Sequence, residues 1–226
     1  NHLEMRQSLY GLDIAWRGHS DTEVLLNYLV HKGVDASLQA AKGMFSFALW
    51  DSKRQALVVA RDRFGEKPLY YSATDGLFMF ASELKALKAN PQFDATLCQP
   101  ALSLFLQHNY VPTPYSIYEN TFKLPAACVL TVGLSQLSEP TSMRYWSAEE
   151  AALEAAHRSS NDVGFDPDQP QSSLADVETA LHTAVERQLV SDVPIGCLLS
   201  GGVDSSLIAA TMQAVSCKPI NTFTLG

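Results

Sequence analysis

IGCLLSGGVDSS, residues 195–206, places a glycine turn between an apolar stretch and a polar one. Residues 195–199 are apolar enough for a buried strand, residues 207–215 have the composition of a helix, and residues 220–225 have that of a second strand. A strand, a glycine turn, a helix and a strand in this order predict a βαβ unit at the start of a parallel-sheet α/β domain.

The glycine turn has the residue types of a phosphate-binding loop. Gly201 and Gly202 lack a Cβ atom, so the backbone can turn sharply and an anion can reach its N–H groups. The following helix directs its positive N-terminal end to the same place. Asp204 does not favour a bare anion, and we expect it to hold Mg²⁺ or to orient the donors of the loop. The expected hydroxyl donors to phosphate oxygens are Ser200, Ser205 and Ser206.

The first 146 residues predict a layered α+β domain. Ser20 and Glu23 form the pattern of a capping box, apolar residues then follow at helical spacing, and Gly33 closes the helix. Two antiparallel hairpins are expected after it, which pair residues 44–50 with 56–60 and residues 68–71 with 77–80.

Composition divides the chain into three parts and argues against several classes of protein. Residues 147–171, Ala/Glu-rich and then polar and Pro-rich, have the composition of a linker between domains at 1–146 and 172–226. A net charge of −8 without a Lys/Arg cluster argues against nucleic-acid binding. No apolar run reaches the roughly 18 residues needed to cross a membrane. The four cysteines and six histidines lack the spacing of a disulfide framework or a zinc site, so a cytoplasmic location is expected.

Four blocks of sequence, in the same order, resemble the B-type glutamine-dependent asparagine synthetases. Residues 191–206 resemble the entry to the synthetase domain of that family, and its glutaminase domain is matched by residues 43–51, 61–65 and 81–87. The glycine turn is no Walker loop, because no Lys-Ser/Thr follows the glycines. It matches the SGGxDS loop of the N-type ATP pyrophosphatases, which cleave ATP to AMP and pyrophosphate. A tight turn whose serines cap the helix is the structural alternative.

The resemblance implies a fold and a reaction. The fold would be α+β followed by α/β: part of an N-terminal-nucleophile (αββα) glutaminase domain, then the first βαβ unit of an adenine-nucleotide-binding synthetase domain. Ammonia from glutamine would travel through a channel and attack β-aspartyl-AMP, so that aspartate, glutamine and ATP give asparagine, glutamate, AMP and pyrophosphate. The implied partners are glutamine, aspartate and ATP, with Mg²⁺ accompanying ATP and no tightly bound organic cofactor. A homodimer is one possible assembly of the intact protein.

The resemblance also assigns residues. Residues 200–206 would grip pyrophosphate, while Leu199 and Leu225 would lie at the adenine. Asp21 would contact the α-amino group of glutamine, although an Asp in the first turn of a helix is also favoured by the helix dipole alone. We interpret the alternating charges of Arg61, Asp62 and Arg63 as a structural ion-pair cluster rather than a substrate clamp.

Departures from the family pattern leave alternatives open. The nucleophilic cysteine is expected to lie outside this chain, since Asn1-His2 continue directly from a family segment that binds glutamine. The remainder of the synthetase domain is also expected outside it, so residues 1–226 alone should be catalytically silent. The alternatives are a β-lactam-forming synthetase, a polysaccharide-cluster amidotransferase with another acceptor, or a non-catalytic nucleotide-binding fragment.

Overall fold

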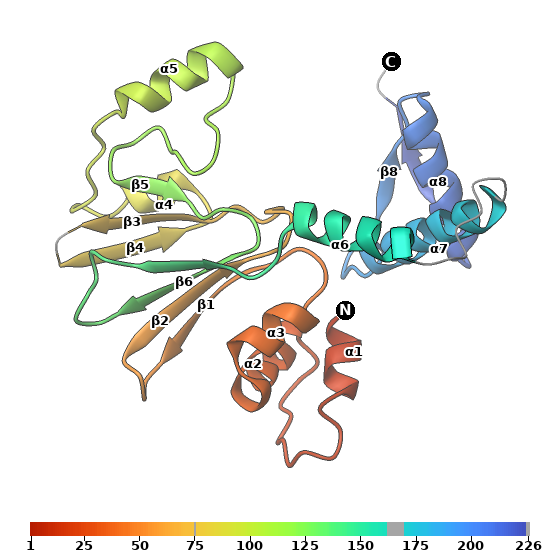
Figure 1. Ribbon diagram of the computed structural model, residues 1–226, viewed down its shortest axis with the longest axis horizontal. Helices are drawn as coiled ribbons and strands as arrows, with labels where there is room; N and C mark the ends of the chain where they lie inside the picture. The colour runs from red at the N-terminus through yellow and green to blue at the C-terminus, as the bar shows by residue number, and fades with distance from the viewer. Residues whose placement is uncertain (75, 162–169, 225–226) are drawn as a thin grey trace. The chain divides into compact units, whose positions relative to one another are not determined.

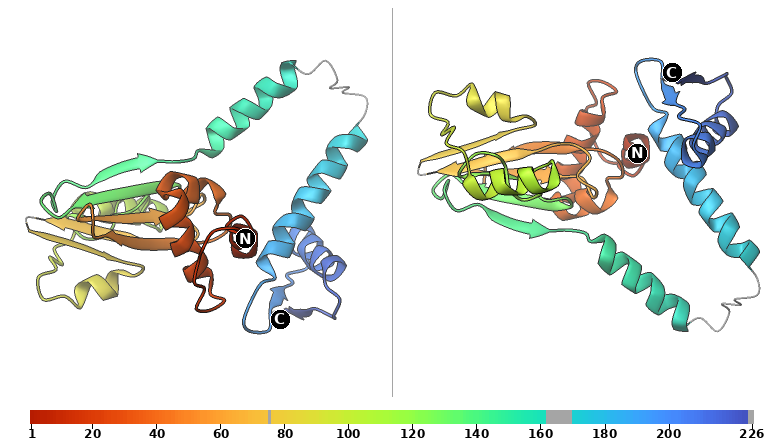
Figure 2. Two further views of the ribbon diagram at one scale, coloured as in Figure 1. Left: turned by 90° about the horizontal axis from the view of Figure 1, so that it is seen from below. Right: turned by 90° about the horizontal axis from the view of Figure 1, so that it is seen from above.

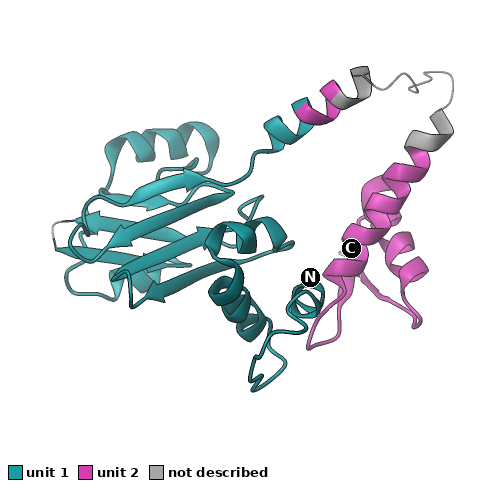
Figure 3. Cartoon of the chain, turned by 60° about the horizontal axis from the view of Figure 1, so that its bottom comes forward, with its two compact units in different colours: residues 1–153 teal, residues 154–226 magenta. Residues whose placement is uncertain are grey.

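The computed structural model describes residues 1–74, 76–161 and 170–224. The chain divides into two compact units, Asn1–Leu153 and Glu154–Gly226 (Figure 3). No helix of the described residues combines the length and the apolar character needed to cross a membrane.

The first unit contains two antiparallel sheets. One has the order β1-β2-β6-β7 and is built from Ser46–Asp51, Ala56–Arg61, Cys128–Gly133 and Thr141–Arg144. The other has the order β4-β3-β5 and is built from Leu77–Ala81, Tyr70–Thr74 and Thr121–Lys123 (Figure 1). Both predicted hairpins are present as β1–β2 and β3–β4, with strand ends within three residues of the expected ones.

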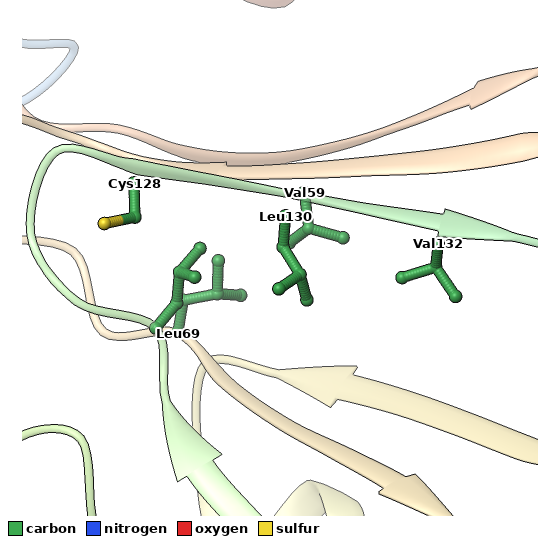
Figure 4. Packing of buried hydrophobic residues seen from close by; sticks show 6 residues of the cluster. Val59, Leu69, Cys128, Leu130 and Val132 are labelled. Carbon is green, nitrogen blue, oxygen red and sulfur yellow. The ribbon is translucent and has the colours of Figure 1, made fainter. Parts of the chain in front are cut away.

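The core of this unit lies between the two sheets. Its buried side chains come from β2, β6 and the segments that flank β3 and β5: Val59, Leu69, Leu124, Cys128, Leu130 and Val132. Figure 4 labels five of them, all but Leu124. Side chains alternate between the faces of a strand, so the next residues along β2 and β6, Ala60 and Val129, point to the opposite face. There they pack with Leu38 of helix α3 (Val34–Ala40). A helix layer, a sheet layer and a second sheet layer therefore follow one another, which gives the mixed α and β content that the sequence predicts.

Three helices precede the first strand and lie together beside β1 and β2 (Figure 2): α1 (His2–Gln7), α2 (Asp21–Lys32) and α3 (Val34–Ala40). The predicted helix is α2, with Ser20 as its N-cap and Gly33 as its C-cap. The Ser20 hydroxyl accepts the N–H of Glu23 at 3.1 Å. The Glu23 carboxylate does not return to Ser20 as in a full capping box, because it instead accepts the N–H groups of Arg17 and Gly18 at 2.6 and 2.8 Å.

Two further helices, α4 (Leu84–Lys88) and α5 (Gln99–His108), lie between β4 and β5 in the sequence. The segment predicted as a linker contains α6, which spans Ala148–Asn161. The Ala/Glu-rich composition explains this helix, since both residues have high helix propensity. Residues 162–169 of the predicted linker lie outside the described residues.

The second unit contains α7 (Pro170–Gln188), β8 (Gly196–Leu198), α8 (Val203–Val215) and β9 (Asn221–Phe223), with β8 and β9 paired in parallel. Val185, Cys197 and Met212 form its core, against which Leu181 and Leu189 pack. Apolar side chains of α7 are buried only in its C-terminal half, because Leu174 and Val177 are exposed. Gly196 is required for close packing, since a Cβ atom there would lie 2.3 Å from the ring of Phe223.

Candidate functional site

The turn between β8 and α8 contains a row of backbone N–H groups without acceptors. Gly201 has a φ of +81°, a left-handed conformation that glycine adopts at little cost, and Gly202 is the N-cap of α8. The first amide of the helix with a backbone partner is that of Ser206, which donates to the carbonyl of Gly202 at 3.1 Å. The amides of residues 201–205 donate no hydrogen bond to any of the described residues. This row of donors at a helix N-terminus is the arrangement that favours a phosphate group.

The serines of the turn have different roles in the structure. The Ser205 hydroxyl donates to the carbonyl of Gly202 at 3.1 Å and accepts the N–H of Ser200 at 3.3 Å. The two hydroxyl oxygens of Ser200 and Ser205 lie 3.0 Å apart. A hydroxyl has one proton, and that of Ser205 is used in the hydrogen bond to the Gly202 carbonyl, so in this geometry Ser205 stabilises the loop. Its role as a donor to phosphate stays a prediction, as does that of Ser206.

Asp204 is exposed in the first turn of α8 and is the one carboxylate of the turn. No group of three or more His, Cys, Asp or Glu side chains is placed to hold a metal within the residues that the structure describes. Mg²⁺ commonly binds through one or two carboxylates together with phosphate oxygens and water. Asp204 therefore fits a Mg²⁺ ion that arrives with a nucleotide, and not an all-protein metal site.

The predicted adenine residues are only partly described. Leu199 is half-buried beside the turn, and its N–H donates to the carbonyl of Phe223 at 2.8 Å. Its own carbonyl accepts the Thr224 hydroxyl at 2.9 Å, a contact that the sequence analysis did not foresee. Leu225 lies outside the described residues.

Asp21 lines a cavity of about 420 Å³ in the first unit. Among the described residues its carboxylate accepts only the N–H and hydroxyl of the neighbouring Thr22, at 2.7 and 3.3 Å and both on Oδ1, so the other oxygen remains available to a ligand. Lys42 and Lys67 line the same cavity. A cavity with one carboxylate and two ammonium groups suits a small zwitterion. The two lysines cannot be found from local sequence patterns, because nothing in them brings residues 42 and 67 near residue 21.

Arg61, Asp62 and Arg63 do not form the ion-pair cluster that we expected. Arg61 donates to the carbonyls of Lys67, Leu124 and Gly65 at 2.7, 2.6 and 2.5 Å. Arg63 donates to the carbonyls of Gln39, at 2.8 Å, and Ala41. None of the salt bridges found among the described residues joins these three side chains.

The carboxylate of Asp62 is fully buried and binds the backbone of its own loop. It accepts the N–H groups of Phe64, Glu66 and Lys67 at 3.1, 2.9 and 2.9 Å, and the Asp62 carbonyl accepts that of Gly65 at 3.1 Å. Burial lowers the pKa of Arg61 below its ordinary value, and the neighbouring charge of Asp62 opposes that shift. The three charged residues are therefore structural, as predicted, but they act on backbone groups.

Comparison with known proteins covers both units. Residues 1–146 match the family model of a glutamine amidotransferase domain, and residues 176–226 match that of asparagine synthase. Asparagine synthetase [glutamine-hydrolyzing] 3 of Bacillus subtilis is 37% identical over 93% of this chain and 32% of its own length. A putative asparagine synthetase [glutamine-hydrolyzing] 2 of Methanocaldococcus jannaschii is 30% identical over 100% of this chain and 41% of its own length. A solved glutamine phosphoribosylpyrophosphate amidotransferase from B. subtilis covers 98% of this chain and 42% of its own at 14% identity and a TM-score of 0.45, too weak a likeness to carry an argument.

The chain belongs to the glutamine amidotransferase domain family, whose model matches more than half of it. Across both units its relatives are glutamine-hydrolysing asparagine synthetases, a class of ligases, which confirms the resemblance carried by the four sequence blocks. The chain spans between 32% and 41% of the length of the two relatives described.

Proposed function

We propose that this chain contributes to glutamine- and ATP-dependent amide synthesis, most directly the conversion of aspartate to asparagine. The observation that carries this proposal is the row of amides without acceptors at the β8–α8 turn, in the segment that matches the asparagine synthase model. The β8–α8–β9 unit would be the first part of a parallel nucleotide-binding sheet that starts near residue 172. Residues 1–146 would be the glutaminase part, joined to it through residues 147–171.

The proposed reaction at the turn has two steps. The side-chain carboxylate of aspartate attacks the α-phosphorus of ATP, and the bond to the β-phosphate breaks, which gives β-aspartyl-AMP and pyrophosphate. Ammonia then attacks the acyl carbon, AMP leaves with the electron pair of the C–O bond, and asparagine forms after loss of a proton. The amides of residues 201–205 would stabilise the charge that develops on pyrophosphate, because preoriented N–H donors act most strongly where negative charge grows. Leu199 and Leu225 would border the adenine, and Asp204 would bind Mg²⁺ that accompanies ATP.

The cavity beside Asp21 would bind glutamine. The Asp21 carboxylate would accept a charge-assisted hydrogen bond from the α-ammonium group, and the lysines of the cavity would attract the α-carboxylate. Hydrolysis there would release ammonia for the second step.

The experiment that tests the proposed reaction is the exchange of labelled pyrophosphate into ATP by the full-length protein. We expect exchange when aspartate and Mg²⁺ are present and none without aspartate, because pyrophosphate can return to ATP only from the acyl-adenylate. Exchange with a different carboxylic acid, and none with aspartate, would assign another acceptor. No exchange with any acid would contradict a pyrophosphate site at the turn.

Replacing Asp21 by alanine should raise the KM for glutamine of the full-length protein by about ten- to a hundredfold, because one charge-assisted hydrogen bond is lost. Synthesis from added ammonia should be nearly unchanged, and the two activities can be measured by glutamate and pyrophosphate release. Asp35→Ala is a matched control, since Asp35 is an exposed carboxylate in the first turn of α3 just as Asp21 is in that of α2. An equal effect of both substitutions would show that Asp21 only stabilises its helix.

A further inference from the structure

A second cavity of the first unit, of about 600 Å³, contains no residue of the proposed glutamine or ATP sites. It lies where the end of β7 and the start of α6 meet the loop after β2 and residues 125–127. Its volume is within the range of about 300–1,000 Å³ that small-molecule sites occupy.

The cavity is positively charged on a protein whose net charge is −8. Arg61, Arg63 and Arg144 line it, and Glu149 is the acidic residue of its lining. The buried Asp62 carboxylate lies beside Arg61. Asp62 and Glu149 together offset two of the three guanidinium charges, which leaves one positive charge at the cavity.

Arg144 is the guanidinium that remains available to a ligand. Arg61 and Arg63 are held in place by backbone carbonyls of the first unit. Arg144 lies at the end of β7, where its residue pairs with Cys128 of β6, and its guanidinium has no hydrogen-bond or ion-pair partner in the part of the chain that the structure describes. A guanidinium fork binds planar carboxylates and phosphates through paired N–H donors.

The cavity also offers an aromatic wall. The rings of Phe64 and Trp146 meet edge to face with their centroids 5.2 Å apart, and the guanidinium of Arg63 lies 6.0 Å from the Trp146 ring. Phe64 remains 70% exposed despite this contact. A flat apolar group that covers it would remove apolar surface from water, which is favourable.

We propose that this cavity binds a small organic anion, with its carboxylate or phosphate group on Arg144 and its flat ring against Phe64 and Trp146. This site is additional to the proposed function and does not depend on it. Tight binding requires a ligand that has both a flat ring and a negative charge, because the aromatic wall and the available guanidinium belong to the same cavity.

The emission of Trp146 tests the proposal directly. Residues 1–226 contain three tryptophans, so Trp16→Phe with Trp50→Phe leaves Trp146 as the single reporter in this segment. Benzyl phosphate and phenylacetate are the probes, and they distinguish a phosphate site from a carboxylate site. Inorganic phosphate supplies the charge without the ring, and benzyl alcohol supplies the ring without the charge. We expect saturable changes in emission with at least one of the two aromatic anions, at concentrations where neither part alone has an effect.

Substitutions should change this binding in opposite directions. Arg144→Gln should weaken it by about tenfold or more, since a hydrogen bond to a charged group is lost. Glu149→Gln should strengthen it, because the acidic residue of the lining is removed. Arg54→Gln is the control, as this exposed arginine lies in the β1–β2 turn and pairs with Asp51 at 3.7 Å. Three results would overturn the proposal. Benzyl alcohol could bind as tightly as the anions, the Arg144 and Arg54 variants could have equal affinities for them, or no probe could give a saturable response.

Discussion

Replacing Asp62 by alanine is expected to lower the free energy of unfolding of the first unit by about 3–5 kcal/mol. The Asp62 side chain is fully buried and accepts three backbone N–H groups. Alanine would remove the buried carboxylate that these N–H groups share, and each donor that is left without an acceptor costs about 1–3 kcal/mol. Urea unfolding followed by tryptophan emission measures this change, because Trp16, Trp50 and Trp146 all lie in the first unit.

Asp94→Ala provides the comparison for Asp62. Asp94 also accepts hydrogen bonds from a nearby loop residue, the N–H and hydroxyl of Thr96 at 2.9 and 2.6 Å, but it is exposed to solvent. Water can replace its contacts, so the midpoint of unfolding should hardly move. Equal midpoints for the two variants would mean that the Asp62 loop contributes nothing special to the stability of the unit.

Replacing Gly201 by valine should reduce aspartate-dependent pyrophosphate exchange by the full-length protein at least a hundredfold. A φ of +81° is strained for a β-branched residue, and the open space beside Gly201 is where the proposal places phosphate. Loss of preoriented donors at one such position typically costs about a hundred- to a thousandfold in rate.

Gly11→Val separates backbone strain from loss of the phosphate site. Gly11 has a φ of +89° and, like Gly201, nothing within 4 Å of the position of an added Cβ. It lies in the first unit, so its substitution should leave pyrophosphate exchange close to the original rate. If Gly201→Val retained exchange at the rate of Gly11→Val, the turn would not be the phosphate site.

The sequence predicts those parts of the fold that depend on neighbouring residues. The two hairpins, the helix from Asp21 to Lys32 and the glycine turn before α8 follow from local patterns of apolar, turn and capping residues. The pairing of β6 with β2 depends on contacts between distant residues, which no local periodicity encodes.

The same distinction applies to the candidate sites. The β8–α8 turn could be predicted because its donors come from consecutive residues. The cavity beside Asp21 could not, because its lysines come from the segments that precede β1 and β3. The alternating charges of Arg61, Asp62 and Arg63 indicated a structural role, but their partners are carbonyls and amides whose positions only the folded backbone defines.

The hydrogen bonds of the loop after β2 also determine which parts of the first unit unfold together. Every backbone amide of residues 64–67 donates to Asp62, through either its carboxylate or its carbonyl. The N–H of Ala127, next to β6, donates to the Asp62 carbonyl as well, at 2.8 Å. Three of these amides share the Asp62 carboxylate, so opening the loop would expose a buried charge and is expected to be costly. Although it has no regular secondary structure, the loop therefore belongs to the same cooperative unit as the sheets, and an inserted residue there would be tolerated no better than one inserted within a central strand.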